Sequence, residues 1–157
     1  MHPVDQREAD VVPGGLTLAT IGRRAVGAII DQFIVLLPVA IGAVAWGFRP
    51  GDIVTDSTLF VINISSAGVA LVYETLLIGL FGRTIGKLVT GTRVVRRDDG
   101  GRVGWFAAAQ RALVPVAAGA VPKAGIVLAA VVYGVAFLGP LRQGIHDRAA
   151  GTLVVRR

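Results

Sequence analysis

Two long apolar blocks dominate the hydrophobic pattern and predict helices that cross a membrane. The first runs from residue 25 to 48 and carries one charge, Asp31. The second runs from residue 59 to 81 and also carries one charge, Glu74. At about 1.5 Å per residue each block makes a helix of about 35 Å, which is enough to cross a hydrocarbon core of about 30 Å.

A third apolar block, residues 112–140, has a less regular pattern. Pro115, Pro122, Lys123 and Gly125 interrupt it. Proline and lysine break an apolar helical run, so the block is either one kinked span or two short helices that turn back. We favour the broken, re-entrant hairpin over a single span.

A seven-residue segment that occurs twice in the chain supports the re-entrant hairpin. Residues 91–97 (GTRVVRR) and 151–157 (GTLVVRR) differ only in their third residue, Arg93 against Leu153. Each copy predicts a short strand, and if the copies pair with each other they lie on the same side of the membrane. Two alternatives remain: the repeat is a coincidence between two basic stretches, or the first strand pairs with residues 102–104 beyond a turn at 98–101.

The pattern therefore predicts an all-α membrane protein with two full transmembrane helices, a third broken or re-entrant segment, and a small cytoplasmic β element. Residues 1–15 are polar and predict a disordered cytoplasmic tail. Residues 16–157 predict a single membrane domain. The first apolar block is too long for a signal-peptide core and is expected to stay uncleaved.

Charge predicts the orientation of the chain. The net charge is +6, and the basic residues flank the apolar blocks, which favours a membrane over nucleic acid as the partner. The loop 49–58 has one basic residue, Arg49, whereas the stretch 82–111 is rich in them: Arg83, Lys87, Arg93, Arg96, Arg97, Arg102 and Arg111. We therefore expect the second loop and the N-terminus to be cytoplasmic, with Arg83 and Lys87 near anionic lipid headgroups.

The composition argues against an enzyme. The chain has no cysteine, and its two histidines, His2 and His146, are far apart in sequence. Disulfides, a cysteine nucleophile and a cysteine or histidine metal site are excluded, and we expect no catalytic residue, metal or cofactor.

The charges inside the apolar blocks are the candidate functional residues. A charge at the centre of a bilayer is unfavourable by ~2.5–3.5 kcal/mol, so it needs a partner or a function. In an antiparallel helix pair, Asp31 and Glu74 lie at similar depth and could handle a proton or a monovalent cation, tuned by Arg24. The alternative is that both carboxylates pair with Arg24, Arg83, Lys87 or Arg111 and only hold the helices together. Asp147 is expected to attach the tail to a basic partner.

These residues together resemble the RDD family of small bacterial membrane proteins, over residues 16–157. Arg24 at the start of the first span matches the family's arginine, with the neighbouring Arg23 as the alternative. Asp31 inside the span matches the first aspartate, and Asp147 matches the second. The run from Gly82 to Lys87 is similar to the family's loop signature, although Leu88 stands where relatives more often have a basic residue.

The resemblance implies a multi-pass protein of the bacterial inner membrane with a transport-related role. The alternative is an accessory or scaffold subunit that binds a partner or anionic lipid. A chain of this size can hardly enclose a pathway alone, so we expect a homo-oligomer or a partner membrane protein. Four glycines within the spans could support close helix contacts: Gly27, Gly42, Gly68 and Gly79.

Overall fold

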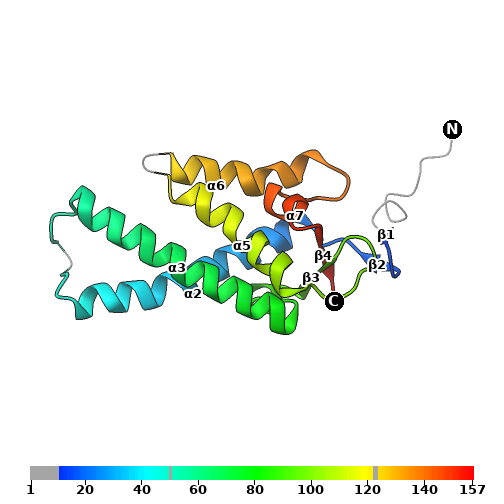
Figure 1. Cartoon of the computed structure of the whole chain (residues 1–157), viewed down its shortest axis with the longest axis horizontal. Coiled ribbons are helices and arrows are strands. Elements are labelled where there is room, and N and C mark those ends of the chain that lie inside the picture. Colours follow the sequence, from blue (N-terminus) through cyan, green and yellow to red (C-terminus); the bar gives the residue numbers. More distant parts are fainter. Residues whose placement is uncertain (1–10, 50, 122–123) are drawn as a thin grey trace.

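A long antiparallel helical hairpin forms the main axis of the molecule (Figure 1). The structure, a computed structural model, describes residues 11–49, 51–121 and 124–157. The hairpin consists of α2 (Ile21–Ala45) and α3 (Asp56–Phe81), and each begins after a threonine whose side chain accepts a backbone N–H of the first turn. Within the described ranges these are the two helices that are long and apolar enough to cross a membrane, and each begins a few residues earlier than predicted.

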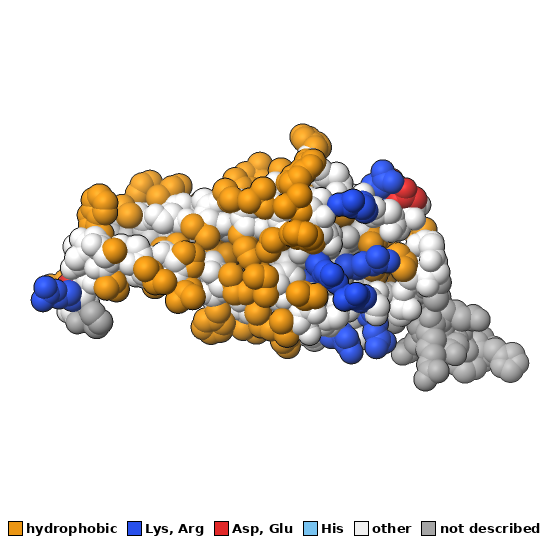
Figure 2. All heavy atoms as spheres, turned by 90° about the horizontal axis from the view of Figure 1, so that it is seen from below, with side chains coloured by type: hydrophobic (Ala, Val, Ile, Leu, Met, Phe, Trp, Pro, Cys, Tyr) orange, Lys and Arg blue, Asp and Glu red, His pale blue; other side chains and the backbone are white. Residues whose placement is uncertain are grey.

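The apolar side chains of this hairpin face outward. Phe33, Ile41 and Phe60 are each more than half exposed, and Figure 2 shows a broad band of hydrophobic side chains across the face in view. The best-buried apolar residues lie instead at the end that carries the strands, among them Leu18, Val94 and Leu153. An outward apolar belt above a small packed end layer is the pattern expected of helices surrounded by lipid.

A second, shorter hairpin packs against the first. It consists of α5 (Trp105–Gly119) and α6 (Gly125–Gly134), which continues into the 3₁₀ turn η1 (Val135–Leu138). α5 ends and α6 begins well short of the far end of the long hairpin (Figure 1). Residues 105–111 and the start of the third apolar block form one helix, because Pro115 is accommodated inside α5.

The polar end of the molecule is built from four short elements. These are α4 (Ile85–Val89), β3 (Thr92–Arg96), α7 (Ile145–Ala149) and β4 (Thr152–Arg156). β3 and β4 pair antiparallel, with Val94 opposite Val154, so the two copies of the heptad lie side by side. Residues 102–104, the alternative partner, form no strand.

The N-terminal segment is ordered further upstream than expected. β1 (Val11–Val12) pairs with β2 (Leu16–Thr17), and Leu18 then bridges to Val155 of β4. The tail predicted to be disordered over residues 1–15 therefore gives way to structure by Val11, since Val12 is buried against Leu18 and the sheet. Residues 1–10 lie outside the described residues.

Candidate functional site

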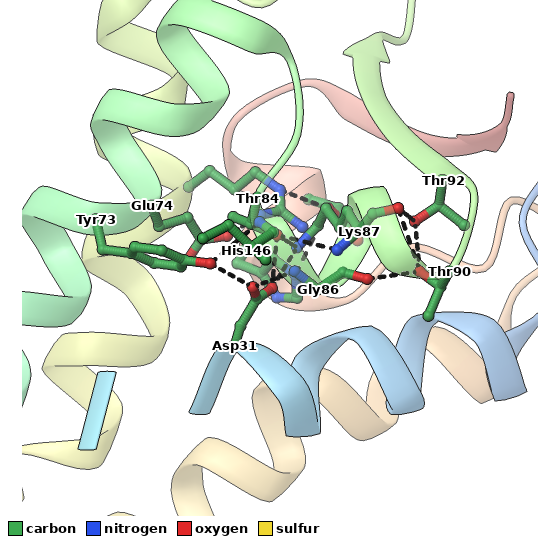
Figure 3. A network of polar contacts seen from close by, with 12 residues as sticks. Asp31, Tyr73, Glu74, Thr84, Gly86, Lys87, Thr90, Thr92 and His146 are labelled. Atoms are coloured by element: carbon green, nitrogen blue, oxygen red, sulfur yellow. Dashed lines mark hydrogen bonds and ion pairs between the residues drawn. The ribbon is translucent and has the colours of Figure 1, made fainter. Parts of the chain in front are cut away.

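Asp31 is bound by three donors from other parts of the chain. Its Oδ1 accepts the hydroxyl of Tyr73 at 2.7 Å and the backbone N–H of Gly86 at 2.8 Å. Its Oδ2 accepts the hydroxyl of Thr84 at 2.6 Å. The Nζ of Lys87 lies 3.6 Å from the same oxygen (Figure 3). The carboxylate therefore joins α2, α3 and α4 at one point.

Glycines bring α4 close enough to α2 for these contacts. A Cβ on Gly86 would lie 2.0 Å from the carbonyl oxygen of Gly27 and 2.9 Å from the Asp31 carboxylate. Gly82 ends α3 in the left-handed conformation, with φ 68°, which turns the chain back toward α2. Thr84 then caps α4 while it donates to Asp31. The glycines of the loop signature are thus explained by backbone turning and close approach.

A second set of charges surrounds Arg111, which projects from α5 and is almost fully buried. Its Nη1 pairs with Glu74 of α3, and its Nε donates to Asp147 Oδ1 of α7 at 3.0 Å. Asp147 also pairs with Arg24 of α2, and Arg24 donates to the carbonyl oxygen of Arg142. The chain of ion pairs from Glu74 to Arg24 therefore ties α2, α3, α5 and α7 together.

Burial and neighbouring charges shift the pKa values of ionisable residues at the end of the molecule that carries the strands. Burial opposes ionisation of Asp147, but Arg111, His146 and Arg24 outweigh it and hold the pKa of this carboxyl well below its usual range. Burial lowers the pKa of His146 to about 4, so its ring is neutral at pH 7. Burial, followed by the charge of Arg111, lowers the pKa of Lys87. Proton loss is therefore easier for Lys87 than for an exposed lysine.

Three neighbouring cavities surround these charges. The smallest, here called the carboxylate cavity, has about 70 Å³ and is lined by both Asp31 and Glu74. The hairpin cavity, of about 460 Å³, lies between α3, α5 and α6, and Glu74 belongs to its lining. The basic cavity, of about 220 Å³, lies between α2 and α6, and Lys87 belongs to its lining. Tyr133 of α6 lines all three, so the three cavities adjoin one side chain.

The hairpin cavity has polar groups although it lies between apolar helices. Gln32 of α2 and Asn63 and Ser66 of α3 contribute to its lining. The Ser66 hydroxyl is buried and has no hydrogen-bond partner in the described structure. An unpaired buried hydroxyl is costly in a dry environment, and a water molecule in this cavity would give the Ser66 hydroxyl a partner.

The structure brings together most of the residues singled out in the sequence, with one change of partner. Asp31 and Glu74 line one cavity, but each has its own cation, Lys87 and Arg111. Arg24, expected to tune these two carboxylates, binds Asp147 instead, because it lies near the start of α2 where α7 packs. Within the described ranges Arg83 contributes no ion pair or hydrogen bond to this network, although it precedes Thr84 directly.

The sequence did not single out Tyr73, Thr84 or Tyr133, and it gave His146 no role in the site. Tyr73 directly precedes Glu74, and Thr84 lies inside the loop signature. Both positions therefore offered a signal for hydroxyl donors to a nearby carboxylate. Tyr133 offered none, because it stands in a run of apolar residues. The residues around His146 indicate only a capped turn, whereas the His146 side chain is 1% exposed.

Two of the four span glycines make close contacts. Gly27 lies against Gly86 and Thr90 of the loop, and a Cβ on Gly79 would lie 2.5 Å from the Trp105 ring. Gly42 and Gly68 have no such neighbour within 4 Å.

The comparison with protein families agrees with this architecture. The family model described as "RDD family" matches residues 18–151, which include Arg24, Asp31, the loop signature and Asp147. No curated protein and no solved structure matches the chain. The two apolar helices and the family match identify a membrane protein, and the chain belongs to the RDD family.

Proposed function

We propose that this protein moves a monovalent cation or protons across the membrane, with Asp31 and Glu74 as the ion-handling carboxylates. The observation that carries the proposal is the place of the carboxylate cavity between the two larger cavities. Glu74 is shared with the hairpin cavity, and Lys87 is shared with the basic cavity. An ion that enters from either side would therefore meet a carboxylate at the junction. Ionisable groups inside a membrane commonly mark such paths.

The long distance between Lys87 and Asp31 suggests how the site could exchange a proton for a cation. Lys87 Nζ lies 3.6 Å from Asp31 Oδ2, too far for a hydrogen bond, and its near hydrogen bond is to the Thr84 hydroxyl at 3.3 Å. Loss of the Lys87 proton would leave Asp31 without a counter-ion, and a Na⁺ or K⁺ ion could then take its place. Because the charge of the site is conserved, proton release and cation entry would be coupled at Asp31.

Glu74 would act differently because its partner, Arg111, also pairs with Asp147. Arg111 remains fixed by Asp147 on its other side, so it cannot follow a moving ion. Glu74 would therefore guide a cation through the hairpin cavity while Arg111 keeps the passage from binding it too tightly.

The charge distribution supports a topology for this activity. Figure 2 shows Lys and Arg gathered beside the apolar belt, at the end that carries the strands. We place this end at the cytoplasmic face of a bacterial inner membrane, together with the N-terminus. A chain with two long apolar helices in its described residues can hardly enclose a pathway alone, so we infer a homo-oligomer or a partner membrane protein.

Flux measurements on the purified protein in liposomes test the proposal. Wild type, Asp31→Asn and Glu74→Gln are compared for Na⁺, K⁺ and H⁺ flux, with Asp98→Asn as the control because this aspartate is 89% exposed. Wild type and the control should show flux above the leak rate, and the two site variants should show little. Size-exclusion profiles verify that each variant is folded. Flux at the leak rate in wild type would reject transport and leave the accessory or scaffold role.

A further inference from the structure

The basic cavity has a surface of one charge sign. Its charged lining residues are Arg24, Lys87 and Arg111, all basic. The carboxylates that neutralise them, Asp147, Asp31 and Glu74, do not belong to the lining. The ion pairs thus place the anions on the far side and leave cations at the cavity. Such a surface favours an anionic ligand.

A buried histidine in the same lining lacks a hydrogen-bond partner. His146 is 1% exposed, and neither Nδ1 nor Nε2 makes a hydrogen bond in the described structure. Nε2 lies 3.5 Å from Asp147 Oδ1, without hydrogen-bond geometry. A neutral imidazole always carries one N–H, so this ring has a donor to offer. A buried donor without an acceptor calls for an explanation, and a ligand in the cavity supplies one.

Apart from Thr92 and Tyr133, the remaining walls of the cavity are apolar, and they reach the outer surface of the molecule. Ala25 of α2, Ala130 of α6 and Phe137 of η1 contribute to the lining, and Phe137 is 71% exposed. The cavity therefore combines a cationic inner end with an apolar mouth between α2 and α6. That combination matches an amphiphile with an anionic head better than a free ion in water.

We propose that the basic cavity binds the phosphate headgroup of an anionic phospholipid that enters sideways between α2 and α6. The guanidinium groups and Lys87 face the phosphate, the His146 ring donates to it, and the acyl chains follow the apolar surface of α2 and η1. Arg111 engages Glu74 and Asp147 through Nη1 and Nε only, so a guanidinium with five N–H groups retains donors. A zwitterionic headgroup fits less well because its own cation meets these residues.

Lipid titration of the full chain in detergent tests the proposal. The probes are a short-chain phosphatidylglycerol, the phosphatidylcholine with the same acyl chains, and glycerol 3-phosphate as the free headgroup. The change is Ala130→Phe, which fills the mouth of the cavity from an exposed helix position. The control is Ala40→Phe, the same substitution at an exposed position of α2 that lines none of the described cavities.

Phosphatidylglycerol should raise the thermal unfolding midpoint of wild type and of Ala40→Phe by several degrees. In Ala130→Phe its binding should weaken by at least about tenfold, since the headgroup is excluded. If Ala130→Phe does not fold, Ala25→Phe on the facing helix takes its place. Equal effects of phosphatidylglycerol on Ala130→Phe and wild type, or of phosphatidylcholine and phosphatidylglycerol on wild type, would overturn the proposal. Equal stabilisation by glycerol 3-phosphate would overturn it too, because the cavity would then bind a soluble anion. No ion gradient is involved, so the result is independent of transport.

Discussion

The carboxylate of Asp31 accepts the backbone N–H of Gly86 at 2.8 Å, which joins a membrane-embedded helix to the first turn of a loop helix. Two hydroxyls complete the set of donors, so one side chain of α2 determines where the loop after α3 lies. This contact makes Asp31 a structural residue as well as the candidate ion site. Experiments on Asp31 must separate the two roles.

Removal of the Asp31 side chain should destabilise the protein strongly. Asp31→Ala leaves the O–H donor of Thr84 and the Gly86 N–H without their acceptor and deprives Lys87 of its counter-ion, a loss of about 3–5 kcal/mol for a partly buried pair. Asp31→Asn keeps one oxygen acceptor and should lose less. Unfolding midpoints in detergent check this order, and equal midpoints for Asp31→Ala and wild type would contradict it.

A side chain at Gly86 should displace α4 from α2. A Cβ there lies 2.0 Å from the backbone oxygen of Gly27, so the helices must separate, at about 1–3 kcal/mol for overpacking. The matched change is Gly42→Ala, in open space on α2, which should leave stability unchanged or raise it by up to about 1 kcal/mol. Thermal unfolding of both variants checks the contrast.

Stability should fall as the pH drops from about 6.5 to about 4, through His146. The pKa of this ring is about 4 in the folded chain and about 6.5 in the unfolded chain, which therefore binds more protons between these values. Stability then rises with pH across this window, by on the order of 3 kcal/mol. His146→Phe should remove this part of the pH dependence, whereas a profile parallel to that of wild type would show that His146 does not cause it.

Disruption of the buried ion-pair chain at Asp147 should be severe. Asp147→Asn leaves Arg24 and Arg111 each without this carboxylate in a buried place, which costs about 3–5 kcal/mol. Asp98→Asn, on the surface, is the control and should behave as wild type. Expression in membranes and unfolding midpoints measure the difference.

Single cysteines test the orientation, since the natural chain has none. Cysteine at Asp52 should react with an impermeant maleimide added outside intact cells. Cysteine at Asp98 or Arg157, at the strand end, should react only after the membrane is opened. Thr152 is unsuitable for labelling because it is fully buried. Labelling of position 157 from outside would reverse or break the proposed topology.

Hydropathy predicted the two long helices well, because helix length and apolar content are properties of the local sequence. The heptad repeat drew attention to the segments that form β3 and β4. Neither signal reports lateral contacts, so the sequence could not pair Arg24 with Asp147 across a separation of 123 residues. The burial of His146 could not be predicted from the sequence for the same reason. A turn next to charged residues is expected to be exposed, and only the packing of α6 over it buries the ring.

The pairing of β3 with β4 also has a mechanical consequence. Everything between Arg96 and Thr152 is a closed loop whose two ends are clamped together at its base. Within that segment α5 packs along α3, and the two helices line the hairpin cavity together. The charged residues sit near the clamp. The β3–β4 pair thus fixes both ends of the segment that supplies Arg111 and Asp147, so the sheet and the ion pairs hold the same segment in place.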